Sequence, residues 1–383
     1  MTIVFYISGH GLGHASREIE VINSVSVRRP DARIVIRTSA PRWFFENAAR
    51  GPIELQEVEV DTGVVQVDSL TLDENETALR AARFYATFEA RVEAEAAVLA
   101  ELEASVVVGD VPPLAFAAAA RTSVSSVALA NFTWDWIYGD YPRFERLAPG
   151  VIGVIRGAYA RTTRALRLPF HGGFEPMADV TEDIPLVARR ATHGRQTVRH
   201  ALDIDDDAVV VLAAFGGYGL RLPYREIARA SRFTLVVTDH ETGPEDIDAS
   251  GPLCRYAIKE LAARDLHYPD LVAAADVVVS KPGYGIVSEC IVNGAALLYT
   301  ARGRFIEHDM LVAEMPRVLR CRYIPREDLP TGRWDDAVDA LLRQPPPPER
   351  LLANGAEVAA DAIIAMADGS GNTRGSSAAR KAP

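Results

Sequence analysis

A glycine-rich segment with two histidines, GHGLGH at residues 9–14, follows an apolar run typical of a strand and precedes a helical stretch. Glycines in such a turn let a ligand approach the backbone, and the first N–H groups of a helix can bind an anion. Histidine exchanges a proton near neutral pH, so His14, at the mouth of the helix, is the candidate general base. For His10 a packing or capping role is the better interpretation. Taken alone, the glycines are equally compatible with a tight turn that binds nothing.

The second half of the chain carries two more glycine turns, FGGYG at residues 215–219 and KPGYG at residues 281–285. Each follows a strand-like apolar run, so both are expected at the carboxyl edge of one sheet, where a pair of anion sites suits a diphosphate. Glu289 lies one helical turn beyond the second glycine turn and is within reach of ribose hydroxyls. An exposed glutamate on a helix surface is the alternative.

The elements that would position these residues alternate between short apolar runs and helical stretches, which predicts an α/β protein with two doubly wound parallel sheets. In the first half, strands are predicted at residues 2–8, 33–38, 53–60, 105–110 and 126–130, with one long helix over 75–103. In the second half, strands are predicted at 208–215, 234–238, 276–280 and 296–300, with helices near 194–202, 284–293 and 307–319. The first glycine turn is not a dinucleotide fingerprint, because its spacing is GxGxG and no acidic residue ends the second strand.

Changes of composition along the chain predict its division into domains. We expect an N-terminal Rossmann-like domain at 1–167, a linker rich in Pro, Gly and acidic residues at 168–190, and a second domain at 191–345. After four consecutive prolines, a helix within 346–368 is expected to cross back to the first domain, and the tail 369–383 is expected to be disordered.

The amino-acid composition favours some classes of protein and argues against others. The 383 residues suffice for two domains, and 48% hydrophobic with 24% charged residues is typical of a globular enzyme. A net charge of -11 argues against nucleic acid as a partner, and no apolar run approaches the ~20 residues of a membrane span. Three cysteines without a CxxC pair, and a strand-like N-terminus, favour a cytoplasmic location.

Several motifs together resemble a known family. GHGLGHASR, DTGVVQVDSLTLD (61–73), GDVPP (109–113) and NFTWDWIYGDY (131–141) are similar to the glycosyltransferase-like N-terminal region of plant L-arabinokinases, and FGGYG, KPGYGIVSE and FIEHDML (305–311) continue the likeness. The sugar-kinase domain of those proteins has no counterpart here, so arabinokinase activity is not predicted. More distantly, the second half resembles the N-acetylglucosaminyltransferase that acts on the lipid-linked peptidoglycan precursor. The resemblance implies the GT-B fold, with two Rossmann-like domains that face a central cleft.

The resemblance also implies residue roles on the donor side. In this superfamily the second domain binds a nucleotide sugar, and a glycine turn followed by a helix with the pattern valine-serine-glutamate, here residues 283–289, holds the diphosphate and ribose. FIEHDML departs from the superfamily, which more often has glutamine in this segment, so the identity of the donor stays open. The residues predicted to bind the donor are Gly217, Tyr218, Gly219, Lys281, Gly283, Tyr284, Gly285, Ser288, Glu289, Glu307, His308 and Asp309.

On the acceptor side, His14 is the predicted catalytic base and Asp135 its rival. Trp134, beside Asp135, is either a platform on which a sugar stacks or part of an aromatic patch that closes the core. Arg17 is expected to contact phosphate or acceptor, or to form a surface salt bridge. Asp110 is expected to contact the acceptor or to cap the next helix, and the loop 61–73 is predicted to bind the acceptor. Gly11 and Gly13 complete the predicted acceptor-side set.

The predicted function is glycosyl transfer from a nucleoside diphosphate sugar, most commonly UDP-linked in this superfamily, to a soluble small-molecule acceptor, with inversion. No cofactor and no metal are expected, because no Asp-x-Asp pair in the chain is convincing as a ligand pair and Asp205-Asp206-Asp207 is typical of a solvated turn. Two alternatives remain. A nucleotide-sugar 2-epimerase would change its substrate without an acceptor, and a non-catalytic sugar or nucleotide-sugar-binding module would bind without turnover.

Overall fold

The computed structural model describes residues 1–217, 219–239 and 253–378, with side chains as far as residue 369. The chain forms two compact units. The first unit comprises residues 1–65, 73–187 and the chain from 352 onward, and the second comprises 66–72 and 188–351. The chain therefore passes between the units four times, after residues 65, 72, 187 and 351.

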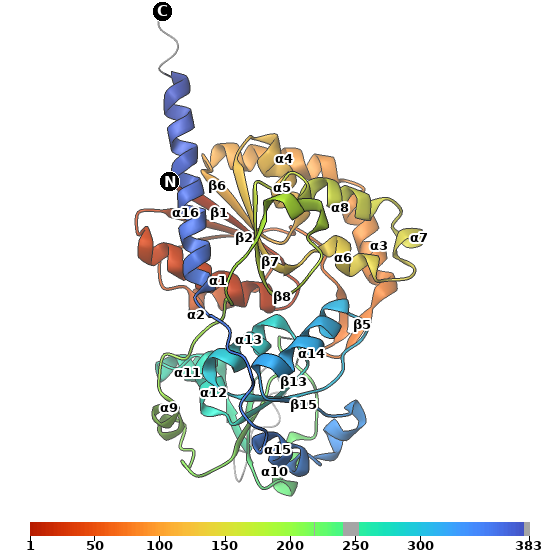
Figure 1. Cartoon of the computed structure of the whole chain (residues 1–383), viewed down its shortest axis with the longest axis vertical. Coiled ribbons are helices and arrows are strands. Elements are labelled where there is room, and N and C mark those ends of the chain that lie inside the picture. The colour runs from red at the N-terminus through yellow and green to blue at the C-terminus, as the bar shows by residue number, and fades with distance from the viewer. Residues whose placement is uncertain (218, 240–252, 379–383) are drawn as a thin grey trace, which may run out of the picture. The chain divides into compact units, whose positions relative to one another are not determined.

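The first unit contains a seven-stranded parallel sheet in the order β3-β2-β1-β6-β7-β8-β9 (Figure 1). Its central strand β1 is buried along its whole length, as its apolar sequence TIVFYI requires. The strands are β1 (Thr2–Ile7), β2 (Arg33–Thr38), β3 (Glu54–Glu57), β6 (Val106–Asp110), β7 (Ser125–Phe132), β8 (Arg164–Gly172) and β9 (Thr181–Asp183). The helices are α1 (Gly13–Arg28), α2 (Arg42–Ala48), α3 (Glu74–Tyr85), α4 (Phe88–Glu101), α5 (Pro113–Arg121), α6 (Trp134–Gly139), α7 (Phe144–Leu147), α8 (Val151–Tyr159), η1 (Glu175–Val180) and α16 (Gly355–Ala378).

The second unit contains a six-stranded parallel sheet in the order β12-β11-β10-β13-β14-β15. The strands are β10 (Val210–Ala213), β11 (Thr234–Thr238), β12 (Leu253–Tyr256), β13 (Val277–Ser280), β14 (Ala296–Tyr299) and β15 (Cys321–Tyr323). The helices are α9 (Arg195–Ala201), α10 (Tyr224–Ala230), α11 (Ile258–Ala263), α12 (Tyr268–Ala274), α13 (Tyr284–Asn293), α14 (Ile306–Val318), η2 (Arg326–Thr331) and α15 (Asp335–Leu342). The prediction of two α/β halves with parallel sheets is confirmed.

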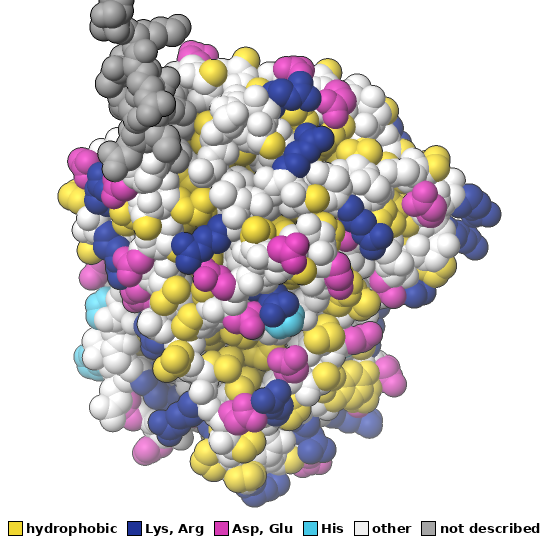
Figure 2. All heavy atoms as spheres, turned by 45° about the horizontal axis from the view of Figure 1, so that its top comes forward, with side chains coloured by type: hydrophobic (Ala, Val, Ile, Leu, Met, Phe, Trp, Pro, Cys, Tyr) yellow, Lys and Arg dark blue, Asp and Glu magenta, His cyan; other side chains and the backbone are white. Residues whose placement is uncertain are grey.

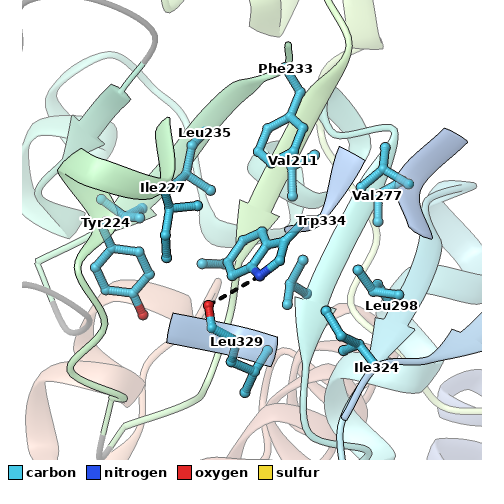
Figure 3. Packing of buried hydrophobic residues seen from close by; sticks show 14 of the residues in the cluster. Val211, Tyr224, Ile227, Phe233, Leu235, Val277, Leu298, Ile324, Leu329 and Trp334 are labelled. Atoms are coloured by element: carbon cyan, nitrogen blue, oxygen red, sulfur yellow. Dashed lines mark hydrogen bonds between the residues drawn. The ribbon is translucent and has the colours of Figure 1, made fainter. Parts of the chain in front are cut away.

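A hydrophobic core lies against this second sheet and centres on Trp334, which is fully buried (Figure 3). The indole Nε1 of Trp334 donates a hydrogen bond of 3.2 Å to the carbonyl of Leu329, so the polar atom of this large side chain is satisfied inside the core. One member of this core, Leu70, comes from the first half of the sequence. It lies in a hairpin formed by β4 (Val65–Asp68) and β5 (Thr71–Asp73).

The structure corrects the sequence prediction in the segments 75–103, 168–190 and 369–378. The long helix predicted over 75–103 is two helices, α3 and α4, and the hydroxyl of Thr87 between them donates to the carbonyl of Phe84, a local bond that competes with helix continuation. The predicted linker 168–190 contains the second half of β8, η1 and β9, and it belongs to the first unit as far as residue 187. The described part of the predicted disordered tail is helical, because α16 extends to Ala378; residues 379–383 lie outside the described residues.

Helix α16 packs against α1 in the first unit, where Asp361 accepts a bond of 2.8 Å from Arg28 and Asp368 one of 2.9 Å from Arg29. No helix within the described ranges is long and apolar enough to cross a membrane. On the face shown in Figure 2, basic and acidic side chains are interspersed.

Candidate functional site

Each sheet has one place where its strand order reverses. In the first sheet β1 pairs with β2 on one side and with β6 on the other, and in the second sheet β10 pairs with β11 on one side and β13 on the other. Ligands of open α/β sheets bind outside the carboxyl ends of the strands at such a switch point. The three predicted glycine turns follow β1, β10 and β13, so all of them lie at a switch point.

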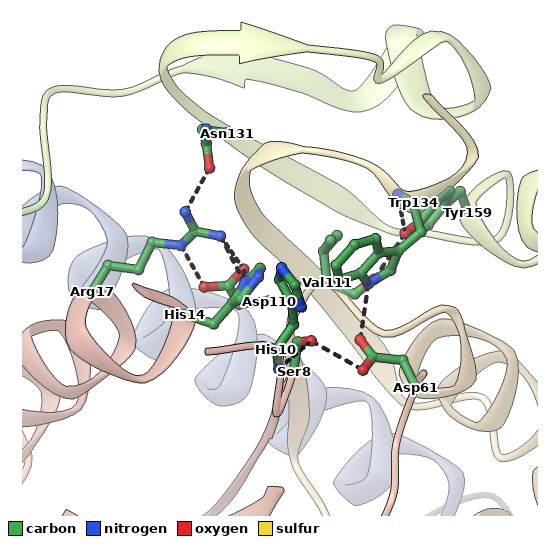
Figure 4. Close-up of polar contacts among 10 residues, drawn as sticks. All are labelled: Ser8, His10, His14, Arg17, Asp61, Asp110, Val111, Asn131, Trp134 and Tyr159. Carbon is green, nitrogen blue, oxygen red and sulfur yellow. Dashed lines mark hydrogen bonds and ion pairs between the residues drawn. The ribbon is translucent and has the colours of Figure 1, made fainter. Parts of the chain in front are cut away.

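In the first unit, this position brings together His14, from the start of α1, and Asp110, the last residue of β6 (Figure 4). Nδ1 of His14 lies 2.8 Å from Oδ1 of Asp110, and both side chains are buried. A carboxylate only accepts, so this contact favours a proton on Nδ1. Nη2 of Arg17, which only donates, lies 3.0 Å from the same nitrogen and favours a lone pair there. The contact with Asp110 is the shorter of the two and corresponds to the tautomer in which Nε2 can take a proton.

Arg17, one turn further along α1, neutralises the Asp110 carboxylate. Its Nε donates to Oδ2 at 2.5 Å, its Nη2 donates to Oδ1, and its Nη1 donates to Asn131 at 2.6 Å. Burial by itself raises the pKa of Asp110, but the charges and hydrogen bonds of Arg17 and His14 outweigh burial and hold that pKa below its ordinary value. Arg17 is buried in this ion pair, so it does not form a surface salt bridge, and its contact with phosphate or acceptor stays a prediction. Asp110 orients His14 and does not cap α5 with its side chain, and its contact with the acceptor also stays a prediction.

Two further buried carboxyl groups flank this cluster. Asp61 accepts hydrogen bonds from the Ser8 hydroxyl at 3.0 Å and from Trp134 Nε1 at 2.8 Å, and burial raises its pKa to about 6. Glu18 is fully buried beside Arg17, and burial, reinforced by the charge of Asp110, raises its pKa well above the ordinary value. Neither oxygen of Glu18 has a hydrogen-bond partner in the described part of the chain. Sequence reasoning missed Glu18, since a glutamate beside an arginine on a helix is ordinarily exposed.

The structure resolves the alternatives left open for Trp134. Its side chain is completely buried, stacks on Tyr138 with ring centroids 5.6 Å apart, and also contacts the rings of His10 and His14 at 5.5 and 5.9 Å. A buried ring offers no face to a sugar, so Trp134 belongs to the aromatic patch that closes the core. Its ring packs against the imidazole of His14.

Asp135, the predicted rival base, is also buried. Its Oδ2 accepts from Arg156 Nε at 3.0 Å, and no hydrogen bond joins it to His14 among the described residues. Of the two candidates for the base, His14 is the one that lies at the switch point, where Asp110 orients its ring.

In the second unit, the strands β10 and β13 are neighbours, so their glycine turns lie side by side at one edge of the sheet. Gly216 and Gly219 have positive φ angles of 82° and 61°, a conformation that favours glycine. Gly216 and Gly217 are exposed, which allows a ligand to reach their backbone. Tyr218 lies outside the described residues.

The second turn leads into α13, whose N-cap is Gly283. The part-exposed Lys281 precedes it, and the buried Tyr284 is the first residue of the helix. The hydroxyl of Ser288 donates to the carbonyl of Gly285 at 2.8 Å, so this side chain is engaged within the helix.

Glu289 is not an exposed helix glutamate, because only 2% of it is accessible. Its Oε1 accepts from Nε and Nη2 of Arg189 at 2.7 and 2.6 Å. Arg189 lies in the segment that enters the second unit, and Asn293 holds this segment against α13 through bonds to the backbone of Arg189 and Ala191. Sequence reasoning missed Arg189, which has no motif and lies 100 residues from its partner.

The three candidate sugar contacts lie in the first turn of α14 and differ in exposure. Glu307 is buried, His308 is half-buried and Asp309 is exposed. Burial, together with the nearby charge of Arg302, lowers the pKa of His308. Its Nδ1 has no hydrogen-bond partner among the residues that the structure describes, so a neutral imidazole with an unused polar atom lies at this position.

Two of the predicted glycines have no structural requirement for glycine. A Cβ added at Gly13 or Gly283 would meet no atom within 4 Å, and neither residue has a positive φ. By contrast, a Cβ at Gly9 would lie 2.1 Å from the Ser39 hydroxyl, and Gly11 has a φ of 66°. The space beside Gly13 and Gly283 is therefore open. Within the described ranges, no group of His, Cys, Asp and Glu side chains is arranged to hold a metal ion.

The chain was compared with known proteins. No protein-family model matches it. Over 377 residues, 96% of the chain, it is 30% identical to L-arabinokinase of Arabidopsis thaliana, which confirms the resemblance seen in the motifs. The match covers 35% of that protein, so the chain spans about a third of the length of this relative.

Solved structures of glycosyltransferases are similar to the chain along nearly its full length. The calicheamicin glycosyltransferase CalG4 has a TM-score of 0.57 at 15% identity, with 100% of this chain and 99% of that one covered. A UDP-glucosyltransferase from Polygonum tinctorium capable of glucosylating indoxyl has a TM-score of 0.58 at 11% identity, with 96% and 98% covered. The chain thus has the GT-B fold, as predicted from the sequence.

Proposed function

We propose that this protein is a glycosyltransferase that moves a sugar from a nucleoside diphosphate donor, UDP-linked, to the hydroxyl of a small soluble acceptor. The observation that carries the proposal is the His14–Asp110 pair at the switch point of the first sheet, in a fold whose second sheet has two glycine turns at its own switch point. The structural neighbours that act on UDP-sugars support the choice of donor.

In the proposed reaction, Nε2 of His14 accepts the proton of the acceptor hydroxyl as its oxygen attacks the anomeric carbon. Asp110 holds the ring through Nδ1 and stabilises the imidazolium that forms, while Arg17 keeps the carboxylate ionised. The bond between the anomeric carbon and the diphosphate breaks in the same step, and a single displacement of this kind inverts the configuration of the sugar.

The leaving diphosphate needs stabilisation, and the second unit supplies it in this proposal. The backbone N–H groups of the glycine turns and the N-terminus of α13 bind the phosphates without a metal, and Lys281 adds a positive charge. Glu289, oriented by Arg189, accepts hydrogen bonds from the ribose, and Glu307, His308 and Asp309 contact the sugar.

A thermal-shift screen against nucleoside diphosphates and nucleotide sugars tests the donor site. A ligand at one hundred times its Kd should stabilise the protein by about 2.7 kcal/mol, a shift of a few degrees. We expect stabilisation by a UDP-sugar that is lost in Glu289→Ala. If no nucleotide shifts the melting temperature, the proposal is wrong. A nucleotide sugar that is converted to its epimer without acceptor would instead identify an epimerase, and binding without turnover under every acceptor would identify a binding module.

A further inference from the structure

The hairpin of residues 66–72 comes from the first half of the sequence and belongs to the second unit. It lies within the segment 61–73, predicted above as an acceptor loop. Its anchor is Leu70, which is buried in the core of the second unit with Phe215 and Ile324 among its neighbours in that cluster. The hairpin is therefore an integral part of the unit that carries the glycine turns.

Ser69, at the tip of this hairpin, contacts the first of these turns. Its hydroxyl lies 2.8 Å from the carbonyl oxygen of Phe215 and 2.6 Å from that of Gly219, and Ser69 is 1% exposed. These two carbonyls belong to the first and the last residue of the turn. A hydroxyl has one hydrogen, so Ser69 shares it between both acceptors and ties the two ends of the turn together.

The same hairpin contacts the loop that leads into α14. The N–H of Gly303 donates to the carbonyl of Leu70 at 2.8 Å, and a Cβ at Gly303 would lie 3.3 Å from the backbone nitrogen of Leu72. Arg326 also contacts the hairpin and donates to the hydroxyl of Thr71 at 3.2 Å. One hairpin thus contacts both the glycine turn after β10 and Gly303, four residues before the first candidate sugar contact, Glu307.

We propose that the hairpin 66–72 is a positioning element of the donor site and that Ser69 sets the affinity for the nucleoside diphosphate by holding the glycine turn in its binding conformation. This inference rests on the proposed function. Glycine loses more backbone freedom than other residues on ordering, so a turn with two positive-φ glycines is expensive to order when a ligand binds. A contact that orders the turn beforehand removes that cost from the binding step.

The experiment compares Ser69→Ala with Ser231→Ala in the 383-residue chain. Ser231 is a matched control, because its hydroxyl also donates to a backbone carbonyl of the second unit, that of Ile227 at 2.7 Å, at the end of α10. Calorimetric titration with UDP should give a Kd about threefold to tenfold higher for Ser69→Ala, as expected for the loss of one hydrogen bond, and an unchanged Kd for Ser231→Ala. Equal Kd values for wild type and Ser69→Ala would overturn the inference.

Hydrogen exchange of the ligand-free protein keeps the inference separate from the proposed function. Ser69→Ala should speed exchange in the peptide 211–222, whereas Ser231→Ala should leave it at the wild-type rate. If wild type binds no UDP, the proposed function fails, and the exchange rates alone then decide whether Ser69 orders the turn. Unchanged exchange in Ser69→Ala would show that it does not.

Discussion

Nδ1 of His14 lies 2.8 Å from a carboxylate oxygen of Asp110, although 96 residues separate the two in the chain. The contact arises because β1 and β6 are adjacent parallel strands, with Ile7 opposite Asp110 in the register, and the turn after β1 returns His14 over the end of β6. The order of the strands in the sheet therefore brings His14 and Asp110 together.

Replacement of His14 by alanine should reduce glycosyl transfer by about 10²- to 10⁴-fold, the usual contribution of a general base. Nucleotide affinity should not change, because the residues proposed to bind the donor belong to the second unit. Steady-state kinetics combined with a UDP titration separates the two effects. His200→Ala, at an exposed position on α9, is the control and should behave as wild type. Full activity in His14→Ala would exclude this residue as the base.

Asp110→Asn should destabilise the fold, because it removes the carboxylate that neutralises the buried charge of Arg17. Removal of one member of a buried ion pair typically costs about 3–5 kcal/mol, which urea denaturation can measure. Glu18 can ionise in place of Asp110 and offset part of the loss, so Glu18→Gln in the Asp110→Asn background should cost more than it does alone. The exposed pair of Asp31 and Arg29 is the control, and Asp31→Asn should have little effect. If Asp110→Asn lowered the free energy of unfolding as little as Asp31→Asn does, Asp110 and Arg17 would not form a buried ion pair.

Asp61 should give the protein a characteristic pH dependence. Burial raises its pKa from 3.8 to about 6, so between these values the folded state holds a proton that the unfolded state has lost. The free energy of unfolding therefore falls by about 3 kcal/mol in total as the pH rises through this window. Above the window this contribution is constant. The free energy of unfolding of wild type minus that of Asp61→Asn should decrease from pH 4 to pH 6.

The control for this pH dependence is Asp183, whose pKa is lowered by its hydrogen bond with Arg167. Here the sign is reversed: the stabilisation is lost as the pH falls below about 4, so the corresponding difference for Asp183→Asn should increase with pH in the acid range. Parallel profiles for wild type and Asp61→Asn between pH 4 and pH 6 would show that Asp61 titrates normally.

Gly283→Ala should impair nucleotide binding without harming the fold. Gly283 and Gly194 are both N-caps with extended ψ angles near 150°, and a Cβ at either would meet no atom within 4 Å. Alanine at each site should therefore have a similar, small effect on the melting temperature. Only Gly283→Ala places a methyl group where the phosphates are proposed to lie, so a UDP titration should detect a loss there and none in Gly194→Ala. Equal affinities would argue against a phosphate site at α13.

Many of the strands and helices could be predicted from the sequence, because buried parallel strands are short apolar runs and glycine turns mark their carboxyl ends. β2 and β11 have the bounds predicted for them, and α13 does too. β8 was missed because Arg164 and Arg167 interrupt the apolar residues of its first half, and its second half lies in the segment from residue 168 whose Pro, Gly and acidic residues suggested a linker.

The candidate site was predicted in its parts and not in its connections. His14 was identified from its position after the glycines, but the burial of Arg17 and the pairing of Glu289 with Arg189 depend on strand order and on a segment 100 residues away. A local pattern carries no signal for a partner of this kind. Trp134 and Asp135 were ambiguous for a related reason, since aromatic residues after a strand are as common in cores as at sugar sites.

The hairpin at residues 66–72 also limits how this protein can be divided. A fragment cut from 188 to 351 would lack Leu70 and Ser69, and its core would have a hole where the leucine side chain belongs. Anyone who exchanges halves between related chains to change the donor should therefore transplant seven residues from the opposite half as well. In evolutionary terms, the two halves cannot be shuffled by a single crossover, and their sequences must change together.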